Sequence, residues 1–279
     1  MASTQFINQA FGPYILREMI GGGGTAEVWR AEHHVDHRPM AVKILRAERM
    51  RERFHVRSFI KEQEVLSELS HPGIPRLRHQ GEVLGRPAFA LDFISGQTLA
   101  EASKHQALLR EQSLLELSLI VSYLHEREII HNDLKLENAI WNTSTTSVTL
   151  LDFGSVKKLG AIREITALIF REQPRFFNTA TYVAPELLAG GKATRASDIY
   201  ALGVCAFILL TGQPPFHDKG QSAMLRAHAS AKPASISERL SSFSLPKAQI
   251  IDACLAKQAE ERPTITDLIA AVRALGKSS

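Results

Sequence analysis

The sequence predicts an α+β protein with two lobes, and two patterns carry that prediction. From residue 14 to about 93 the pattern is mostly that of strands, and one segment has helical spacing. From residue 96 onward the spacing is mostly helical, with one strand–turn–strand pattern. A small strand-rich lobe followed by a larger helical lobe is therefore expected. The stretch 92–97, within "DFISGQT", is the expected hinge.

Composition fits a folded chain and excludes some partners. With 279 residues and 44% hydrophobic residues, the chain can fill one large core or two modest ones. The formal charge of +4 is too small and too dispersed to predict a nucleic-acid partner. Its one basic run, 46–57, is more typical of a solvated helix face than of a docking surface.

The cysteines and the apolar runs predict a cytoplasmic protein. Cys205 and Cys254 lack the spacing of a metal site or a disulfide framework, so we expect buried thiols in a reducing compartment. The first residues do not resemble a signal peptide. The most apolar run, 199–210, is too short to span a bilayer and predicts a buried helix.

A run of glycines joins the first two predicted strands. "YILREMI" leads into "GGGGTAEVWRA", and a run without Cβ atoms lets backbone amides approach an anion. A flexible hairpin turn would have the same composition. Since a strand follows and not a helix, the pattern argues against a dinucleotide fingerprint and against a Walker loop.

The next strand and helix predict an ion pair. In "RPMAVKILRA", Lys43 points to the opposite face from its two apolar neighbours. In the helix that follows, Glu62 lies on the same stripe as Phe59 and Leu66. A carboxylate on a buried face is costly without a cation, and Lys43 is the obvious candidate.

The second half places polar side chains around a predicted hairpin. "IIHNDLKLENAIWN" brings Asp133, Lys135 and Asn138 close together in sequence. "AIWN", "TSTTS" and "VTLLDFG" predict a β-hairpin whose outer ends place Asn138 beside Asp152. Two oxygen ligands at one point suit Mg²⁺, and Asp133 would lie within reach as a base.

These motifs together resemble the eukaryotic-type protein kinases. The resemblance is carried by the glycine run, the "AVK" of Lys43, Glu62, "HNDLKLEN", "DFG" at 152–154, "APE" at 184–186 and "SDIYALGV" at 197–204. The glycine loop looks most like that of the bacterial Ser/Thr kinases. The resemblance implies the two-lobed protein kinase fold over 14–279, after an N-terminal extension at 1–13. Its N-lobe would span about 14–91, its hinge about 92–97 and its C-lobe about 98–276.

The resemblance also assigns roles. Asp133 would orient the attacking hydroxyl, Lys135 would steady the transferred phosphoryl group, and Asn138 and Asp152 would hold Mg²⁺. Lys43, held by Glu62, would contact the α and β phosphates of ATP. The residues that it assigns to ATP binding are Ile20, Gly21, Gly22, Gly23, Gly24, Thr25, Ala26, Val28, Ala41, Lys43, Glu62, Asp92, Ile94 and Ile140.

Three departures from the family pattern bear on activity. Ala26 replaces the third loop glycine, Leu136 replaces a proline, and Asn132 stands where many relatives have arginine. Because Asn132 has no charge for a phosphate to neutralise, we predict activity without phosphorylation of the activation segment. Thr166 is the one well-placed hydroxyl there. Apolar contacts of Ile169, Phe170, Phe176 and Phe177 would order the segment instead.

The predicted function is an ATP-dependent Ser/Thr protein kinase whose partners are ATP and a protein with a Ser or Thr acceptor. Lys135 beside Asp133 resembles the Ser/Thr-directed catalytic loop, and the resemblance pairs Glu186 with Arg262. One alternative is an inactive ATP-binding scaffold, which the full set of catalytic groups disfavours. The other is a small-molecule kinase of the aminoglycoside phosphotransferase type, which "NTATYVAPE" and "SDIYALGV" disfavour. The substrate and the oligomeric state are not predicted.

Overall fold

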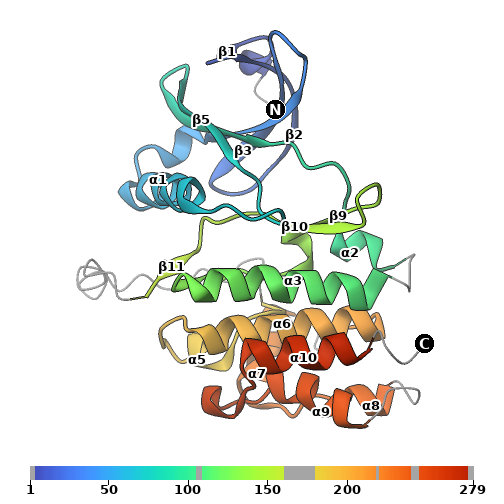
Figure 1. Cartoon of the computed structure of the whole chain (residues 1–279). Coiled ribbons are helices and arrows are strands. Elements are labelled where there is room, and N and C mark those ends of the chain that lie inside the picture. Colours follow the sequence, from blue (N-terminus) through green and yellow to red (C-terminus); the bar gives the residue numbers. More distant parts are fainter. Residues whose placement is uncertain (1–3, 105–108, 160–179, 218–219, 240–244, 276–279) are drawn as a thin grey trace. The chain divides into compact units, whose positions relative to one another are not determined.

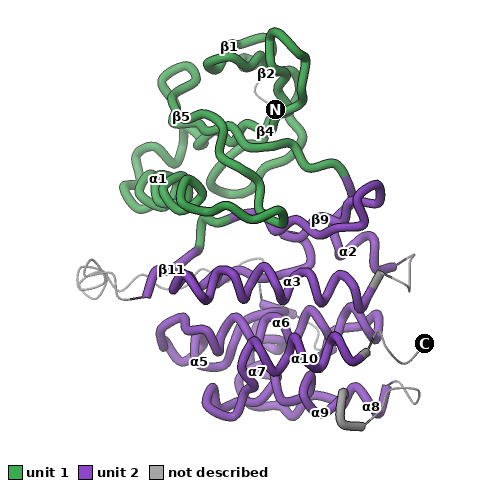
Figure 2. Tube along the Cα trace, in the orientation of Figure 1, with its two compact units in different colours: residues 1–95, 153–155 green, residues 96–152, 156–279 purple. Residues whose placement is uncertain are grey.

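The computed structural model describes residues 4–104, 109–159, 180–217, 220–239 and 245–275. The chain divides into two compact units, coloured separately in Figure 2. The first unit comprises residues 1–95 and 153–155, and the second comprises 96–152 and 156–279. The first is rich in strands and the second is mostly helical, which confirms the predicted α+β class.

The first unit is a six-stranded antiparallel sheet with one long helix, α1 (Figure 1). The strand order is β1-β2-β3-β4-β6-β5. The elements are η1 (Thr4–Phe6), β1 (Ala10–Phe11), β2 (Tyr14–Gly22), β3 (Ala26–His33), β4 (Pro39–Leu45), η2 (Ala47–Arg49), α1 (Arg53–Glu68), β5 (Leu77–Val83) and β6 (Arg86–Asp92).

The two faces of this sheet differ in burial. One face carries Trp29, Val42 and Ile44, which pack in a core with Phe6 and Phe11. Phe6 and Phe11 are 0% and 1% exposed, so residues 4–13, which the sequence suggests as an extension, contribute to the core of the unit. The other face carries Lys43 in register with Val28 and Phe89. Helix α1 packs there, with the Phe59 and Phe89 ring centroids 4.9 Å apart.

The second unit contains the remaining helices and three short strand pairings. Its elements are β7 (Gln97–Thr98), α2 (Leu99–Ala102), α3 (Leu109–Glu126), β8 (Ile129–Ile130), η3 (Leu136–Asn138), β9 (Ala139–Asn142), β10 (Ser147–Leu150), β11 (Lys157–Lys158), α5 (Pro185–Leu188), α6 (Arg195–Thr211), α7 (Gln221–Ser230), α8 (Ile236–Arg239), α9 (Leu245–Cys254), η4 (Ala259–Glu261) and α10 (Ile265–Leu275).

Helix α6 is the buried centre of this unit and confirms the helix predicted from the most apolar run. It contacts α3 and α9, and α10 packs on α3 (Figure 1). A capping box of Thr194 and Ser197 begins the helix, and Gly212 in the left-handed region ends it. A Cβ at Gly203 would lie 2.6 Å from the Cβ of Cys254, so glycine permits the close packing of α6 on α9.

The predicted hairpin is present as β9 and β10, with Ala139 opposite Leu150. The Asn142 side chain accepts hydrogen bonds from the N–H groups of Ser144 and Thr145 and so stabilises the turn. Strand β7 pairs with β9 next to Gly96, where a Cβ would collide with the carbonyl oxygen of Trp141. Among the helices that the structure describes, none combines the length and the apolar character needed to cross a membrane.

Candidate active site

The predicted ion pair of the first unit is present. The Lys43 Nζ on β4 lies 2.8 Å from each carboxylate oxygen of Glu62 on α1. The Glu62 side chain is 4% exposed and that of Lys43 is 18% exposed. Glu62 is therefore a buried anchor, while the lysine remains within reach of a further anion.

Helix α1 also holds the residues that follow Asp152. The Phe153 N–H donates to Glu62 Oε1 at 3.3 Å, and the Ser58 hydroxyl donates to the Gly154 carbonyl at 2.7 Å. The Phe153 side chain is buried. One helix therefore positions both the lysine and the beginning of the 153–155 segment.

Some of the predicted ATP-binding residues of the first unit lie on the face of the sheet that carries Lys43. The others lie at the ends of β2 and β6. Val28 and Ala41 are half-buried, whereas the side chains on the opposite face of the same strands are buried in the core. Ile20 and the glycines 22–24 are exposed in and after β2. Ile94 is half-buried. The Asp92 carboxylate pairs with Arg78 at 2.6 and 3.1 Å, and the Asp92 N–H donates to the Arg76 carbonyl at 3.1 Å.

In the second unit, Asp133, Lys135 and Asn138 are brought together. The Lys135 Nζ lies 2.7 Å from Asp133 Oδ2, and the Asn138 amide nitrogen donates to the same oxygen at 3.0 Å. It also donates to the Asp133 carbonyl at 3.0 Å. The buried side chain of Leu136 anchors the loop between them. A carboxylate held by a lysine and an amide is a suitable acceptor for a hydroxyl proton.

The backbone brings Asn138 and Asp152 to the open end of the hairpin. The Leu151 N–H donates to the Asn138 carbonyl at 2.7 Å, and the exposed Asp152 follows directly. Because Asp133 holds the Asn138 amide nitrogen, Asn138 Oδ1 faces away from it. No described residue donates to that oxygen. An amide oxygen and a carboxylate are ligands that Mg²⁺ prefers, so these two residues fit the metal.

A buried carboxylate of α6 supports the loop that contains Asp133, and the sequence analysis does not assign it this role. Asp198, 1% exposed, accepts the backbone N–H groups of His131 and Asn132 at 2.8 and 2.9 Å. The His125 Nε2 lies 3.0 Å from the same carboxylate. The available signal was a lone carboxylate in an otherwise apolar run, since a buried charge requires partners.

The neighbours of Asp133 have structural roles. Asn132 has φ of 63°, in the left-handed region that asparagine tolerates better than most residues. His131 is fully buried, and burial lowers the pKa of its ring, so that it is neutral near pH 7. A buried neutral ring of this kind contributes to packing.

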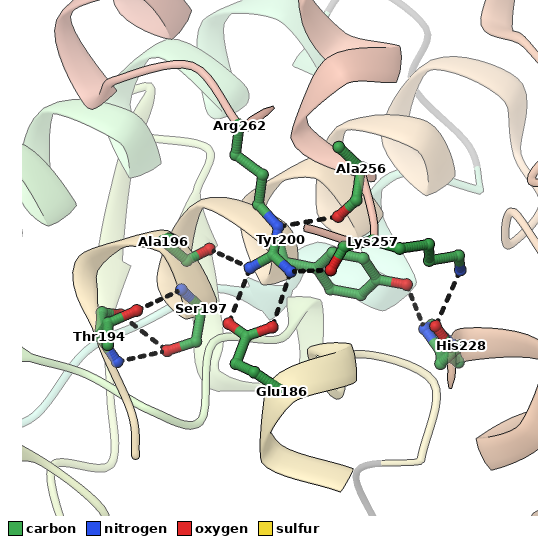
Figure 3. A network of polar contacts seen from close by, with 9 residues as sticks. All are labelled: Glu186, Thr194, Ala196, Ser197, Tyr200, His228, Ala256, Lys257 and Arg262. Atoms are coloured by element: carbon green, nitrogen blue, oxygen red, sulfur yellow. Dashed lines mark hydrogen bonds and ion pairs between the residues drawn. The ribbon is translucent and has the colours of Figure 1, made fainter. Parts of the chain in front are cut away.

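The predicted pair of Glu186 and Arg262 is also present (Figure 3). Arg262 binds both oxygens of Glu186, at 2.8 and 2.7 Å. It also donates to the carbonyl oxygens of Ala196, Ala256 and Lys257. Its guanidinium lies over the Tyr200 ring, and the Tyr200 hydroxyl lies 2.8 Å from His228 Nδ1. The residues that the sequence analysis assigns to the activation segment lie outside the described residues; they are Thr166, Ile169, Phe170, Phe176 and Phe177.

Comparison with known proteins agrees with this geometry. The model of the protein kinase domain family matches residues 14–272, so the chain belongs to that family. It is 29% identical to the serine/threonine-protein kinase PknJ of Mycobacterium tuberculosis, over 95% of this chain and 45% of the relative. It is 30% identical to PkaA of Streptomyces coelicolor, over 95% of this chain and 50% of the relative. Identity to PrkC of Bacillus subtilis is 29%, over 79% and 34%. The chain therefore spans half or less of the length of these relatives.

Proposed function

We propose that this chain transfers the γ-phosphoryl group of Mg-ATP to a Ser or Thr hydroxyl of a protein. The observation that carries the proposal is the Asp133 carboxylate, held by Lys135 and Asn138 next to the hairpin end with Asp152. The names of the relatives, which are serine/threonine-protein kinases, support the class of acceptor.

The residues of the second unit would act on the acceptor and the metal. Asp133 accepts the proton of the attacking hydroxyl, and Lys135 stabilises the charge on the transferred group. Asn138 and Asp152 hold Mg²⁺. When bound, the metal neutralises charge on the phosphate oxygens of ATP. The buried Asp198 fixes the backbone from which Asp133 projects.

The residues of the first unit would bind the nucleotide. Lys43, anchored by Glu62, contacts the α and β phosphates, and the backbone of the loop 20–26 covers them. Val28 and Ala41 offer a half-buried apolar face for the adenine ring. Ile140 of the second unit is also assigned to ATP binding, and the backbone of Asp92 and Ile94 to the edge of the adenine ring.

Two further parts belong to the proposal. Asn132 brings no charge to the catalytic loop, and therefore activity does not require a phosphate on the activation segment. A cytoplasmic location is proposed because the donor is ATP and because Cys205 and Cys254 are free thiols.

The experiment is incubation with γ-labelled ATP, Mg²⁺ and a panel of generic protein substrates. The wild type should label Ser or Thr, and Asp133→Asn should reduce the rate at least about a hundredfold. Asp36→Asn, in the exposed turn between β3 and β4, is the matched control and should keep the wild-type rate. A wild type that binds ATP without transfer would favour the scaffold, and transfer to small aminoglycosides alone would favour the other alternative.

A further inference from the structure

Two arginines from the basic run that follows β4 bind the tip of the glycine loop. The Arg46 Nε donates to the Gly23 carbonyl at 2.8 Å, and the Arg49 Nε donates to the Gly24 carbonyl at 2.8 Å. The backbone N–H of Arg46 donates to the Thr25 carbonyl at 2.9 Å. Three successive carbonyl groups of the loop are therefore directed to one short segment of the first unit.

This arrangement fixes the direction of the loop amides. In a trans peptide the N–H points opposite to the C=O, so the N–H groups of Gly24 and Thr25 point away from the arginines. Neither N–H donates a hydrogen bond to a residue that the structure describes. Adjacent N–H groups that point the same way form a concave site for an anion.

Other contacts hold the arginines in place. Arg46 reaches the buried Glu27 at 3.5 Å, and Glu27 is itself bound by Arg86 at 3.2 Å. Arg49 pairs with Glu52 at 2.6 Å. Both arginine side chains are only partly exposed, so they act as fixed donors to the loop.

We propose that Arg46 and Arg49 are positioning residues, which hold the glycine loop so that the Gly24 and Thr25 amides face a nucleotide phosphate. The inference rests on the proposed function, because it takes ATP as the ligand of the loop. It gives a role to part of a basic run that would otherwise be a solvated surface.

The test compares a double variant, Arg46→Gln with Arg49→Gln, with the control double variant Arg51→Gln with Arg53→Gln. Both change the charge equally within the same run, and Arg51 and Arg53 are exposed residues without a contact to the loop in the described structure. Dissociation constants are measured for Mg-ATP and for adenosine, which lacks phosphates. The loop variant should lose about tenfold in ATP affinity, and its adenosine affinity should stay at the wild-type value. The control should match the wild type for both ligands.

Three results would overturn the proposal. They are an unchanged ATP affinity, an equal loss in the control, and an equal loss for adenosine, which would indicate a general structural defect. A third variant, Arg46→Lys with Arg49→Lys, keeps the charge but not the planar donor, and it should recover only part of the affinity. A wild type that binds ATP without transferring phosphate would contradict the proposed function alone, because the test measures binding. A wild type without ATP affinity would contradict both.

Discussion

The Lys43–Glu62 pair of the first unit and the Arg262–Glu186 pair of the second unit are both ion pairs of a glutamate, but they have different roles. Both join a glutamate to a cation at 2.7 to 2.8 Å. The Arg262 side chain is 0% exposed, and all of its N–H donors are engaged by Glu186 and three carbonyl groups. The Lys43 side chain is 18% exposed, and its partner Glu62 is the more buried member.

The difference shows which pair can exchange partners. A planar guanidinium with every donor satisfied is fixed in one geometry, and its loss would leave buried carbonyls and a carboxylate without partners. An ammonium on a flexible stem can turn toward a second anion without leaving the first. We therefore expect changes at Lys43 to affect activity, and changes at Arg262 to affect stability.

The largest expected effect on activity follows from removing the charge of Lys43. Lys43→Met should lower kcat/KM at least about a hundredfold, because the phosphates lose a charge that acts in the transition state. The variant should still fold, although the midpoint of urea unfolding should decrease because the buried Glu62 loses its cation. The comparison would fail if this variant were fully active, or if it were inactive only because it was unfolded.

The next largest effect is a loss of stability when the Arg262–Glu186 pair is altered. Arg262→Lys keeps the charge but cannot satisfy Glu186 and three carbonyls together, so it should lower the free energy of unfolding by about 3 kcal/mol. Urea denaturation measures this change. Arg239→Lys, on the surface helix α8, is the matched control and should change stability by less than about 0.5 kcal/mol. A loss of activity per folded molecule, with stability unchanged, would assign Arg262 to the chemistry instead.

His228, which contacts Tyr200 beside the Arg262–Glu186 pair, should make the stability of the protein sensitive to acid. His228 is fully buried, and burial lowers its pKa to about 4 from an ordinary value of 6.5. The unfolded chain therefore takes up the proton first as the pH falls, and stability decreases between pH 6.5 and 4. The cost at pH 5 is about 2 kcal/mol for this group.

Unfolding in urea at pH 7 and pH 5 checks the acid effect. His228→Gln should be less stable than the wild type at pH 7, because the Tyr200 hydroxyl contact is altered. It should nevertheless lose less stability between the two pH values. An equal loss in both proteins would assign the acid sensitivity to other groups, such as the buried His131.

The smallest effect is expected at Thr166. Thr166→Ala and phosphatase-treated wild type should keep activity within about tenfold of the untreated protein, which corresponds to roughly 1.4 kcal/mol in the barrier. Substrate phosphorylation by the three samples measures this. A larger loss that returns with phosphate at Thr166 would contradict the interpretation of Asn132.

Side-chain patterns carried most of what the sequence could predict. Lys43 was placed by strand alternation, Glu62 by helical spacing, and the neighbourhood of Asn138 and Asp152 by hairpin geometry. Each of these depends on a regular period or on the closure of a short turn.

Contacts between side chains and backbone carried what was missed. Asp198 binds two N–H groups, and Arg46 and Arg49 bind carbonyls. Every residue has a backbone carbonyl, and every residue except proline has a backbone N–H, so no pattern of residue types marks these contacts. The core position of Phe6 was missed because a single turn and a two-residue strand have no periodicity to detect.

The central claim is that Lys43 contacts the nucleotide, whereas Arg262 of the second unit serves the fold. Lysine acylation by acetic anhydride, followed by mass spectrometry with and without Mg-ATP, tests it directly. Burial lowers the pKa of Lys257 to about 8, so it carries reactive amine near neutral pH and serves as the internal control. Mg-ATP should slow acylation of Lys43 at least about tenfold, as expected for an amine held by a phosphate, and leave Lys257 unchanged. Equal rates at Lys43 with and without Mg-ATP, or equal protection of both lysines, would contradict the account.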